Sequence, residues 1–186
     1  MPKLRFLDPN TITVAAIDAG IKHTGISLWM KSQLHSVTDL ERDVMTSDSP
    51  ARMADMIEQH IRKTVKNGVL LVVEDYGYGG GFFNAMQPEI VGVLKARALD
   101  KQNNLAGIVF IPPNTVKKRV TGNGDADKNK VRRAVIRAGY GGKNRGKDMS
   151  THSADSIALF LTYLQLWNQP TESMYRRAVF IERPDN

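Results

Sequence analysis

Acidic residues end two apolar stretches of the sequence, and a third acidic residue lies near a histidine. Asp18 follows the run VAAI, and Glu74 follows the run VLLVV. His152 and Asp155 are three positions apart in STHSADSIALF, a segment predicted to be helical. Because residues three apart share one face of a helix, their side chains are expected to be neighbours. If that helix packs across the two strand ends, three carboxylates and an imidazole meet.

Such a cluster points to metal-ion chemistry. Carboxylates close together repel one another unless a cation binds between them or their pKa values rise. Oxygen ligands with one imidazole suit Mg²⁺ or Mn²⁺ better than Zn²⁺. Two such ions, typically about 4 Å apart, activate a water and stabilise the leaving oxygen in phosphodiester cleavage. This chemistry needs no thiol, and the chain has no cysteine, which excludes disulfides, thiolate metal sites and cysteine nucleophiles.

Each of the four residues has a simpler structural interpretation when it is considered alone. Asp18 and Glu74 would each fit an ordinary turn at the end of a strand, and His152 would fit a structural histidine. Asp155 fits poorly as a surface residue, because its neighbours in the segment are apolar. The ordered set favours a site more strongly than any single member does.

The positive charge of the chain is concentrated in one segment. The protein has 26 Lys and Arg against 19 Asp and Glu, a net charge of +7 in 186 residues. Residues 112–150 hold 11 basic and 3 acidic side chains, while residues 1–111 are neutral in sum. A concentrated basic segment binds phosphates, because each neutralised phosphate releases counterions. The alternative is a solvated face that serves solubility, and of the two we expect a nucleic-acid partner.

Strands are predicted where short apolar runs lack a helical period. Ile12–Asp18, His23–Met30 and Leu34–Leu40 are the first three, and the tight KSQ connection predicts an antiparallel meander. VLLVV is apolar throughout, which predicts a central strand covered on both faces. GIVFIPP predicts a fifth strand that two prolines end. Parallel strands bring their carboxyl ends to one edge of a sheet, where α/β folds place their sites.

Helices are predicted from apolar periodicity and from residues typical of helix ends. In the first helix Ser49 is expected to cap, Pro50 to occupy the first position and Gly68 to end the helix. Its apolar face is predicted to comprise Met53, Met56, Ile57, Ile61 and Val65. The other predicted helices span about Pro88–Asn103, Thr115–Val120, Lys128–Ala138 and Ser150–Trp167. The remaining C-terminal tail shows no clear pattern.

The pattern of elements predicts one α/β domain, with its core in about residues 12–166 and a C-terminal tail in residues 167–186. The N-terminal residues lack the apolar stretch of a signal peptide, and no run is long enough to span a bilayer. No membrane partner is therefore expected, and the protein is predicted to be soluble and cytoplasmic.

Four motifs, in this order, resemble those of the RuvC family of Holliday-junction resolvases, within the RNase H-like nuclease superfamily. IDAGIKHTGISL is similar to the family's first-strand motif, and VVED to the strand that ends in its catalytic glutamate. NTVKKRVTGNGDADKNKV resembles its basic segment. HSADSIAL is similar to the terminal helix motif, with His152 where some members have aspartate. The resemblance covers about residues 12–166.

The resemblance implies an α/β RNase H-like fold, which is a five-stranded mixed sheet flanked by helices, and a homodimer. Each subunit would nick one of two opposed strands of a four-way DNA junction, a substrate whose symmetry suits an isologous dimer. Two Mg²⁺ or Mn²⁺ ions would be held by Asp18, Glu74, His152 and Asp155.

The resemblance also implies which basic residues bind DNA. Lys117 and Lys128 would contact the phosphates near the cut, and Lys128 would belong to the catalytic group. Further DNA contacts are expected from Lys118, Arg119 and Lys130.

The segment after Glu74 departs from the family pattern. DYGYGGGFFNAM is a few residues longer than in bacterial members, and the family has an aromatic residue here that stacks at the junction centre. Phe82 is the best positional match, with Phe83, Tyr76 and Tyr78 as competitors. Stacking on an unpaired base contributes about 1–3 kcal/mol, although one of the phenylalanines would instead pack on the second helix. The longer segment and the divergent tail favour a bacteriophage-type member acting in the host cytoplasm, and they leave a partnership with a bacterial branch-migration motor open.

Three other functions are compatible with the sequence. A related RNase H-like nuclease would use the same metals on flaps, forks or RNA–DNA hybrids. An actin- or Hsp70-like ATPase would explain DAGIKHTG as a phosphate loop, but those folds need two such domains and a much longer chain. A non-catalytic junction-binding protein would gain nothing from carboxylates that face phosphates.

Overall fold

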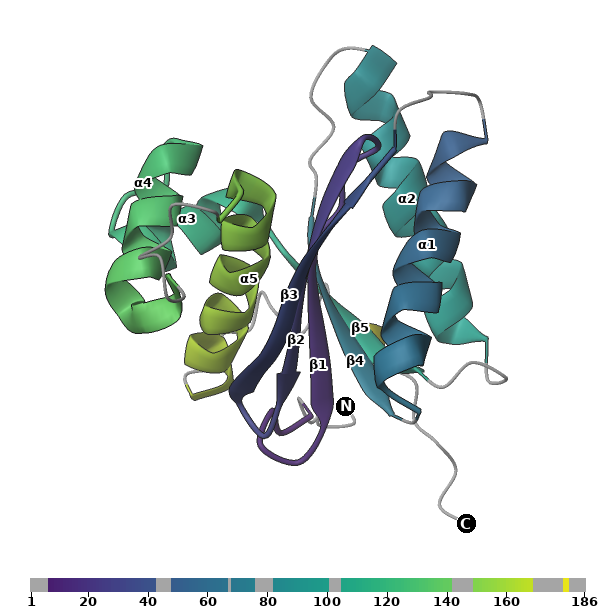
Figure 1. Ribbon diagram of the computed structural model, residues 1–186, viewed down its shortest axis with the longest axis horizontal. Helices are drawn as coiled ribbons and strands as arrows, with labels where there is room; N and C mark the ends of the chain where they lie inside the picture. The colour runs from purple at the N-terminus through teal and green to yellow at the C-terminus, as the bar shows by residue number, and fades with distance from the viewer. Residues whose placement is uncertain are drawn as a thin grey trace, which may run out of the picture.

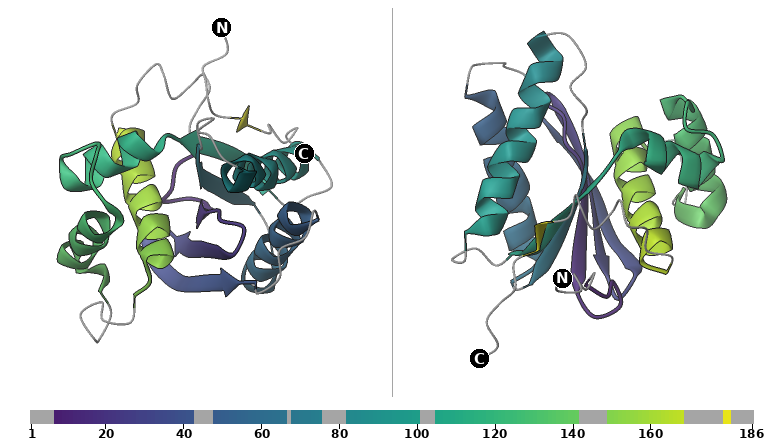
Figure 2. Two further views of the ribbon diagram at one scale, coloured as in Figure 1. Left: turned by 90° about the horizontal axis from the view of Figure 1, so that it is seen from above. Right: turned by 180° about the vertical axis from the view of Figure 1, so that it is seen from behind.

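A mixed β-sheet lies between two layers of helices in the computed structural model, which describes residues 7–42, 48–66, 68–75, 82–100, 105–141, 149–168 and 179–180 (Figure 1). One face carries α1 (Ser49–Thr64) and α2 (Phe82–Leu99). The other face carries α5 (Thr151–Asn168), with α3 (Pro113–Thr121) and α4 (Lys128–Val135) packed against it. Figure 2 shows the same layers from above and from behind. No helix in these ranges is both long and apolar enough to cross a bilayer.

The sheet has the strand order β3-β2-β1-β4-β5-β6. Its strands are β1 (Thr13–Asp18), β2 (His23–Met30), β3 (Gln33–Glu41), β4 (Val69–Glu74), β5 (Leu105–Ile111) and β6 (Val179–Phe180). The first three form the predicted antiparallel meander, and β4 and β5 run parallel to β1. The five-stranded mixed sheet is thus confirmed, with β4 central and buried. The prediction for the C-terminal tail is corrected in one respect. The tail shows no clear pattern in the sequence, but its two-residue strand β6 pairs antiparallel with β5.

The start and end of α1 differ from the sequence prediction. Asp48 occupies the N-cap position that was expected for Ser49, and the helix ends at Thr64, before Gly68. Ser49 is buried in the first turn. Proline is accommodated at either of the first two helical positions, so Pro50 marks the beginning of the helix only to within a residue.

Other helix ends are also corrected by the structure. α2 begins at Phe82 and contains Pro88, so the prediction that Pro88 opens this helix is wrong. An internal proline removes one backbone hydrogen bond, and the rest of the helix can still form around it. α2 ends at Leu99, and α3 is longer than predicted. α4 continues into a π-helical turn, Ile136–Tyr140, in which Gly139 has a φ of 97°.

Alternation along the strands divides the core into two clusters, one on each face of the sheet. Val14 and Ala16 of β1 pack on the side of α5, while Ala15 and Ile17 pack on the side of α1 and α2. Both faces of β1 and β4 are therefore buried, which explains the unbroken apolar runs Val14–Ile17 and Val69–Val73 within them. Within these strands, charged residues stand at the last positions, Asp18 in β1 and Glu74 in β4.

Packing of α5 on the sheet is testable at Phe160, whose buried ring stacks on Trp29 of β2 with 3.8 Å between centroids and 10° between planes. Phe160→Ala is expected to lower the free energy of unfolding by about 3–5 kcal/mol. Urea unfolding followed by circular dichroism measures this value. Gln165→Ala, at an exposed position of the same helix, is the control and should change stability by less than about 0.5 kcal/mol. Equal effects of the two substitutions would contradict this packing.

Candidate active site

Asp18 and Glu74 end neighbouring parallel strands on the same face of the sheet. The last residue pair between β1 and β4 is Ile17 with Val73, so the two acidic residues come next on strands that lie side by side. Their side chains point to the face of α5, because in each strand the residues two and four positions earlier pack on that face. The register of two strands therefore brings two carboxylates together.

The first turn of α5 is held against one transverse row of the sheet. Asp18, Gly25 and Asp39 are cross-strand neighbours in β1, β2 and β3. His152 Nδ1 lies 2.7 Å from Oδ2 of Asp18, and the Ser153 hydroxyl donates a hydrogen bond of 2.9 Å to Oδ1 of Asp39. Between these contacts the helix backbone passes over Gly25, where a Cβ would lie 2.0 Å from the His152 carbonyl oxygen. This approach requires a residue without a side chain.

The candidate residues share one pocket, with a volume of about 270 Å³, at the carboxyl ends of β1 and β4. Helices α2, α3, α4 and α5 supply the rest of its wall, together with Gly20 in the turn between β1 and β2. Its polar and charged lining comprises Asp18, Glu74, Gln87, Lys117, Lys128, His152 and Asp155. Three carboxylates, an imidazole and two ammonium groups are therefore assembled from five different elements, and Gln87 adds an amide from a sixth.

Burial and charge perturb two groups in this pocket. Asp18 is only 3% exposed, and its hydrogen bond with His152 raises the pKa of that imidazole above its usual value, against the opposing effect of burial. Burial, followed by the nearby charge of Asp18, raises the pKa of Asp155 to about 6. Lys128 opposes this shift, since its Nζ lies 3.5 Å from Oδ2 of Asp155. The pocket therefore crowds negative charge that the imidazole and one lysine only partly offset.

This donor set fits a hard divalent cation. Burial first, and then the charge of Asp18, raise the pKa of Asp155, and a bound cation would favour the ionised carboxylate against both effects. Carboxylate oxygens are the ligands that Mg²⁺ prefers. In the part of the chain that the structure describes, no group of three or more such side chains is arranged to hold an ion as it lies. The donors are instead paired, Asp18 with His152 and Asp155 with Lys128. A cation that enters the pocket has to compete with these pairs.

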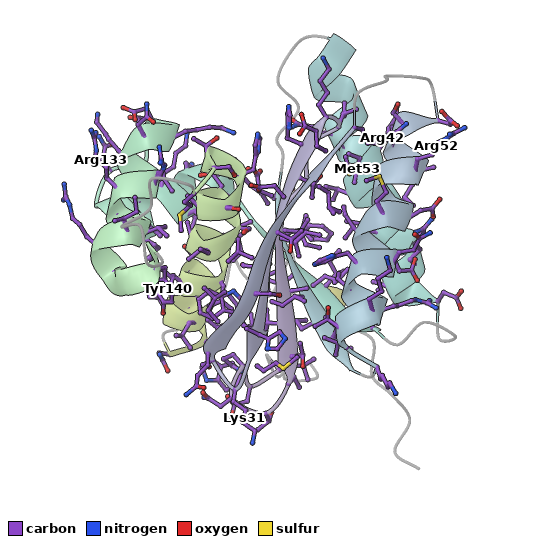
Figure 3. All side chains as sticks on the ribbon, viewed as in Figure 1. Lys31, Arg42, Arg52, Met53, Arg133 and Tyr140 are labelled. Atoms are coloured by element: carbon purple, nitrogen blue, oxygen red, sulfur yellow. The ribbon has the colours of Figure 1, made fainter. Side chains whose placement is uncertain are left out.

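Two of the five basic residues predicted to bind DNA line this pocket, and the other three lie on the same two helices. Lys117 on α3 and Lys128 on α4 belong to its lining. On the same two helices, outside the lining, are Lys118, Arg119 and Lys130. Arg133 of α4 points away from the rest of the molecule (Figure 3). Basic side chains thus extend from the pocket to the outer surface of α4.

The aromatic candidates fall mostly outside the described structure. Tyr76 and Tyr78 lie outside the described residues, and Phe82 and Phe83 form the first residues of α2, with side chains beyond the described part. Gln87, one helical turn after Phe83, lines the pocket and was not identified from the sequence. α2 has several other polar residues, among them Asn84, Glu89 and Lys95, so a single glutamine carries no pattern by which it could have been found.

Three antiparallel strands continued by two parallel ones, with helices on both faces and acidic residues at the central strand ends, define an RNase H-like fold. Two solved structures share it with this chain. The structure of RuvC from Thermus thermophilus is 19% identical, covers 91% of this chain and 100% of its own, and has a TM-score of 0.61. T. thermophilus RuvC in complex with a Holliday junction substrate is 18% identical, covers 91% and 99%, and has a TM-score of 0.63. No protein-family model matches the sequence, and no curated protein matches it.

The close contact of α5 with β2 predicts that Gly25→Ala is destabilising. The new methyl group would overlap the His152 carbonyl, so the helix must move outward, at a cost of about 1–3 kcal/mol in the free energy of unfolding. Gly92→Ala in α2, where the added methyl meets open space, is the matched control and should raise stability by up to about 1 kcal/mol. Urea unfolding of both variants measures the contrast. If Gly25→Ala proved as stable as the control, the helix would not lie this close to the sheet.

The raised pKa of Asp155 predicts how stability depends on pH. In the folded chain the Asp155 carboxyl stays protonated up to about pH 6, and in the unfolded chain only up to about pH 4. The free energy of unfolding therefore falls as the pH rises between these values. Asparagine cannot ionise, and Asp155→Asn is therefore expected to be more stable than the original above pH 6 in EDTA, by on the order of 1–2 kcal/mol. The gain should vanish below about pH 4. Melting temperatures across this range test the expectation, with the exposed Asp125→Asn as control; a gain that is independent of pH would contradict it.

Proposed function

We propose that this protein is a metal-dependent, structure-selective endodeoxyribonuclease that resolves four-way DNA junctions by paired symmetric nicks. The observation that carries the proposal is the pocket in which Asp18, Glu74, His152 and Asp155 lie beside Lys117 and Lys128. Support comes from the likeness of the fold to RuvC, one structure of which holds a Holliday junction substrate. The fold alone would also fit other chemistry, so the residues of the pocket carry the argument.

The proposed metal ligands are the three carboxylates and the imidazole. These residues would hold two Mg²⁺ or Mn²⁺ ions, which would supply Lewis-acid chemistry for activating a water and stabilising the leaving oxygen. Asp18 is fixed by its buried strand end, and it orients His152 through the 2.7 Å contact with Nδ1. The Nζ of Lys128 lies 3.5 Å from Oδ2 of Asp155. From this position the ammonium group would neutralise the negative charge of a phosphate bound in the pocket beside Asp155.

Basic residues on α3 and α4 provide the DNA-binding surface in this proposal. Carboxylates repel a phosphodiester backbone, so an acidic site on DNA needs a surrounding basic surface to hold the substrate. Lys117 and Lys128 lie inside the pocket, and Lys118, Arg119 and Lys130 continue the positive charge along the same helices. The aromatic candidates Tyr76, Phe82 and Phe83 would stack at the open centre of the junction.

A homodimer is part of the proposal because a junction presents two equivalent strands. Each pocket would cut one of them, and an isologous dimer relates its two pockets by the two-fold symmetry of the substrate. The proposed bacteriophage-type origin, with action in the host cytoplasm, rests on the segment after Glu74 and on the tail, most of which lies outside the described residues.

The proposal predicts metal-dependent cutting confined to the branch point. An immobile four-way junction is incubated with the protein in Mg²⁺ or in EDTA, beside linear duplex, flap and RNA–DNA hybrid substrates. Paired nicks at symmetric positions are expected in Mg²⁺ only. Asp155→Asn should lower the cutting rate by more than about 100-fold, because even the outer partners of metal ligands typically matter 10- to 100-fold. Its affinity for the junction in EDTA should hold or rise, because one negative charge facing the DNA is removed.

The control for that variant is Asp125→Asn, an exposed acidic residue of the basic segment outside the pocket lining. It should cut at the original rate. Equal cutting of flaps or hybrids would replace the proposal by a broader structure-selective nuclease with the same pocket. Tight junction binding without any cutting would favour a non-catalytic junction-binding protein, and unchanged cutting by Asp155→Asn would remove that residue from the site.

A further inference from the structure

His23 lies beside the pocket and has no role in the proposed chemistry. It begins β2, its side chain is 46% exposed, and its ring stacks on that of His152 with 5.5 Å between centroids and 18° between planes. Its Nδ1 lies 3.6 Å from Oε1 of Glu41, its cross-strand partner in β3. One imidazole of this stack therefore meets Asp18 and the other meets Glu41.

The backbone that carries His23 is held in a fixed conformation. The Thr24 hydroxyl donates a hydrogen bond of 2.8 Å to the Gly20 carbonyl and accepts one of 3.2 Å from the Gly20 amide. Gly20 approaches His23 so closely that a Cβ there would lie 2.2 Å from the His23 carbonyl oxygen. The ring is thus presented from a well-defined turn, although its side chain reaches solvent.

His152 needs a second contact to fix the plane of its ring. The 2.7 Å contact with Asp18 fixes the position of Nδ1, and the backbone of His152 is fixed over Gly25. The ring torsion of histidine has a broad energy profile, so one hydrogen bond leaves the plane free to tilt. A flat ring against one face removes this freedom, as offset stacking of aromatic rings does elsewhere.

We propose that His23 is a positioning residue for His152: its ring, braced by Glu41, covers one face of the His152 ring and holds the plane in which Nδ1 meets Asp18. Only the expected effect on DNA cutting rests on the proposed function. The stack then fixes the direction in which Nε2 of His152 points, which is the ring nitrogen that does not contact Asp18. The role belongs to the flat face of His23 and needs neither of its nitrogens.

The experiment compares His23→Ala with His23→Phe, which keeps a flat ring and has no nitrogen. Long-range ¹H–¹⁵N spectra of the His152 imidazole report its environment without any substrate. Mn²⁺ titration by calorimetry reports the ligand set, and single-turnover cutting of the junction reports the reaction. His23→Ala is expected to shift the His152 signals and to weaken Mn²⁺ binding and slow cutting by about 10-fold each. Junction affinity in EDTA should stay within about twofold of the original.

His23→Phe should restore most of the Mn²⁺ affinity and of the cutting rate. His35→Ala, another exposed histidine in the meander at the far end of β3, is the matched control and should leave all readouts unchanged. The proposal is overturned if His23→Ala behaves like this control, or if His23→Phe is as impaired as His23→Ala, which would assign the role to a nitrogen. If the original protein fails to cut junctions, the proposed function fails, while the His152 spectra and the Mn²⁺ titration still decide the role of His23.

Discussion

The candidate site depends on how closely one helix turn lies against the sheet. The first turn of α5 contacts three strands in one transverse row, through Asp18, Gly25 and Asp39. Two side-chain contacts flank a point where two backbones touch directly, so the helix can neither slide along the row nor rotate on it. This contact fixes the positions of His152 and Asp155. The register of β1 and β4 places the two strand-end carboxylates, Asp18 and Glu74, beneath it.

The pocket is less favourable for stability than the core around it. Asp155 of α5 is largely removed from water and lies near the charge of the strand-end Asp18, and these two effects raise its pKa to about 6. His152 and Lys128 compensate in part, each by pairing with one carboxylate. A site whose excess negative charge is to be balanced by a bound cation needs such crowded carboxylates. Sites of this kind commonly reduce the stability of the protein that contains them.

The sequence predicted the parts of the fold that are encoded locally. Apolar runs identified the strands, and the acidic residue that ends each of two runs identified Asp18 and Glu74, because a charge after a buried run is itself a local signal. The start of α2 was wrong, since the preference of proline for the first turn says little about whether residues before Pro88 are also helical. The pairing of Ser153 with Asp39 and the stacking of His23 on His152 join residues more than 100 positions apart. No periodicity or spacing encodes such contacts, because they arise only when the sheet and α5 come together.

The order in which these segments are synthesised has a consequence for the unfinished chain. The meander with Asp18 leaves the ribosome first, and the helix that contacts it comes 134 positions later. Until α5 emerges, the sheet has two of its carboxylates but neither the imidazole nor the third, and the apolar face with Val14, Ala16 and Trp29 is uncovered. The same helix therefore closes the core and completes the pocket in one step. An incomplete chain is therefore an aggregation-prone species that still lacks part of the pocket.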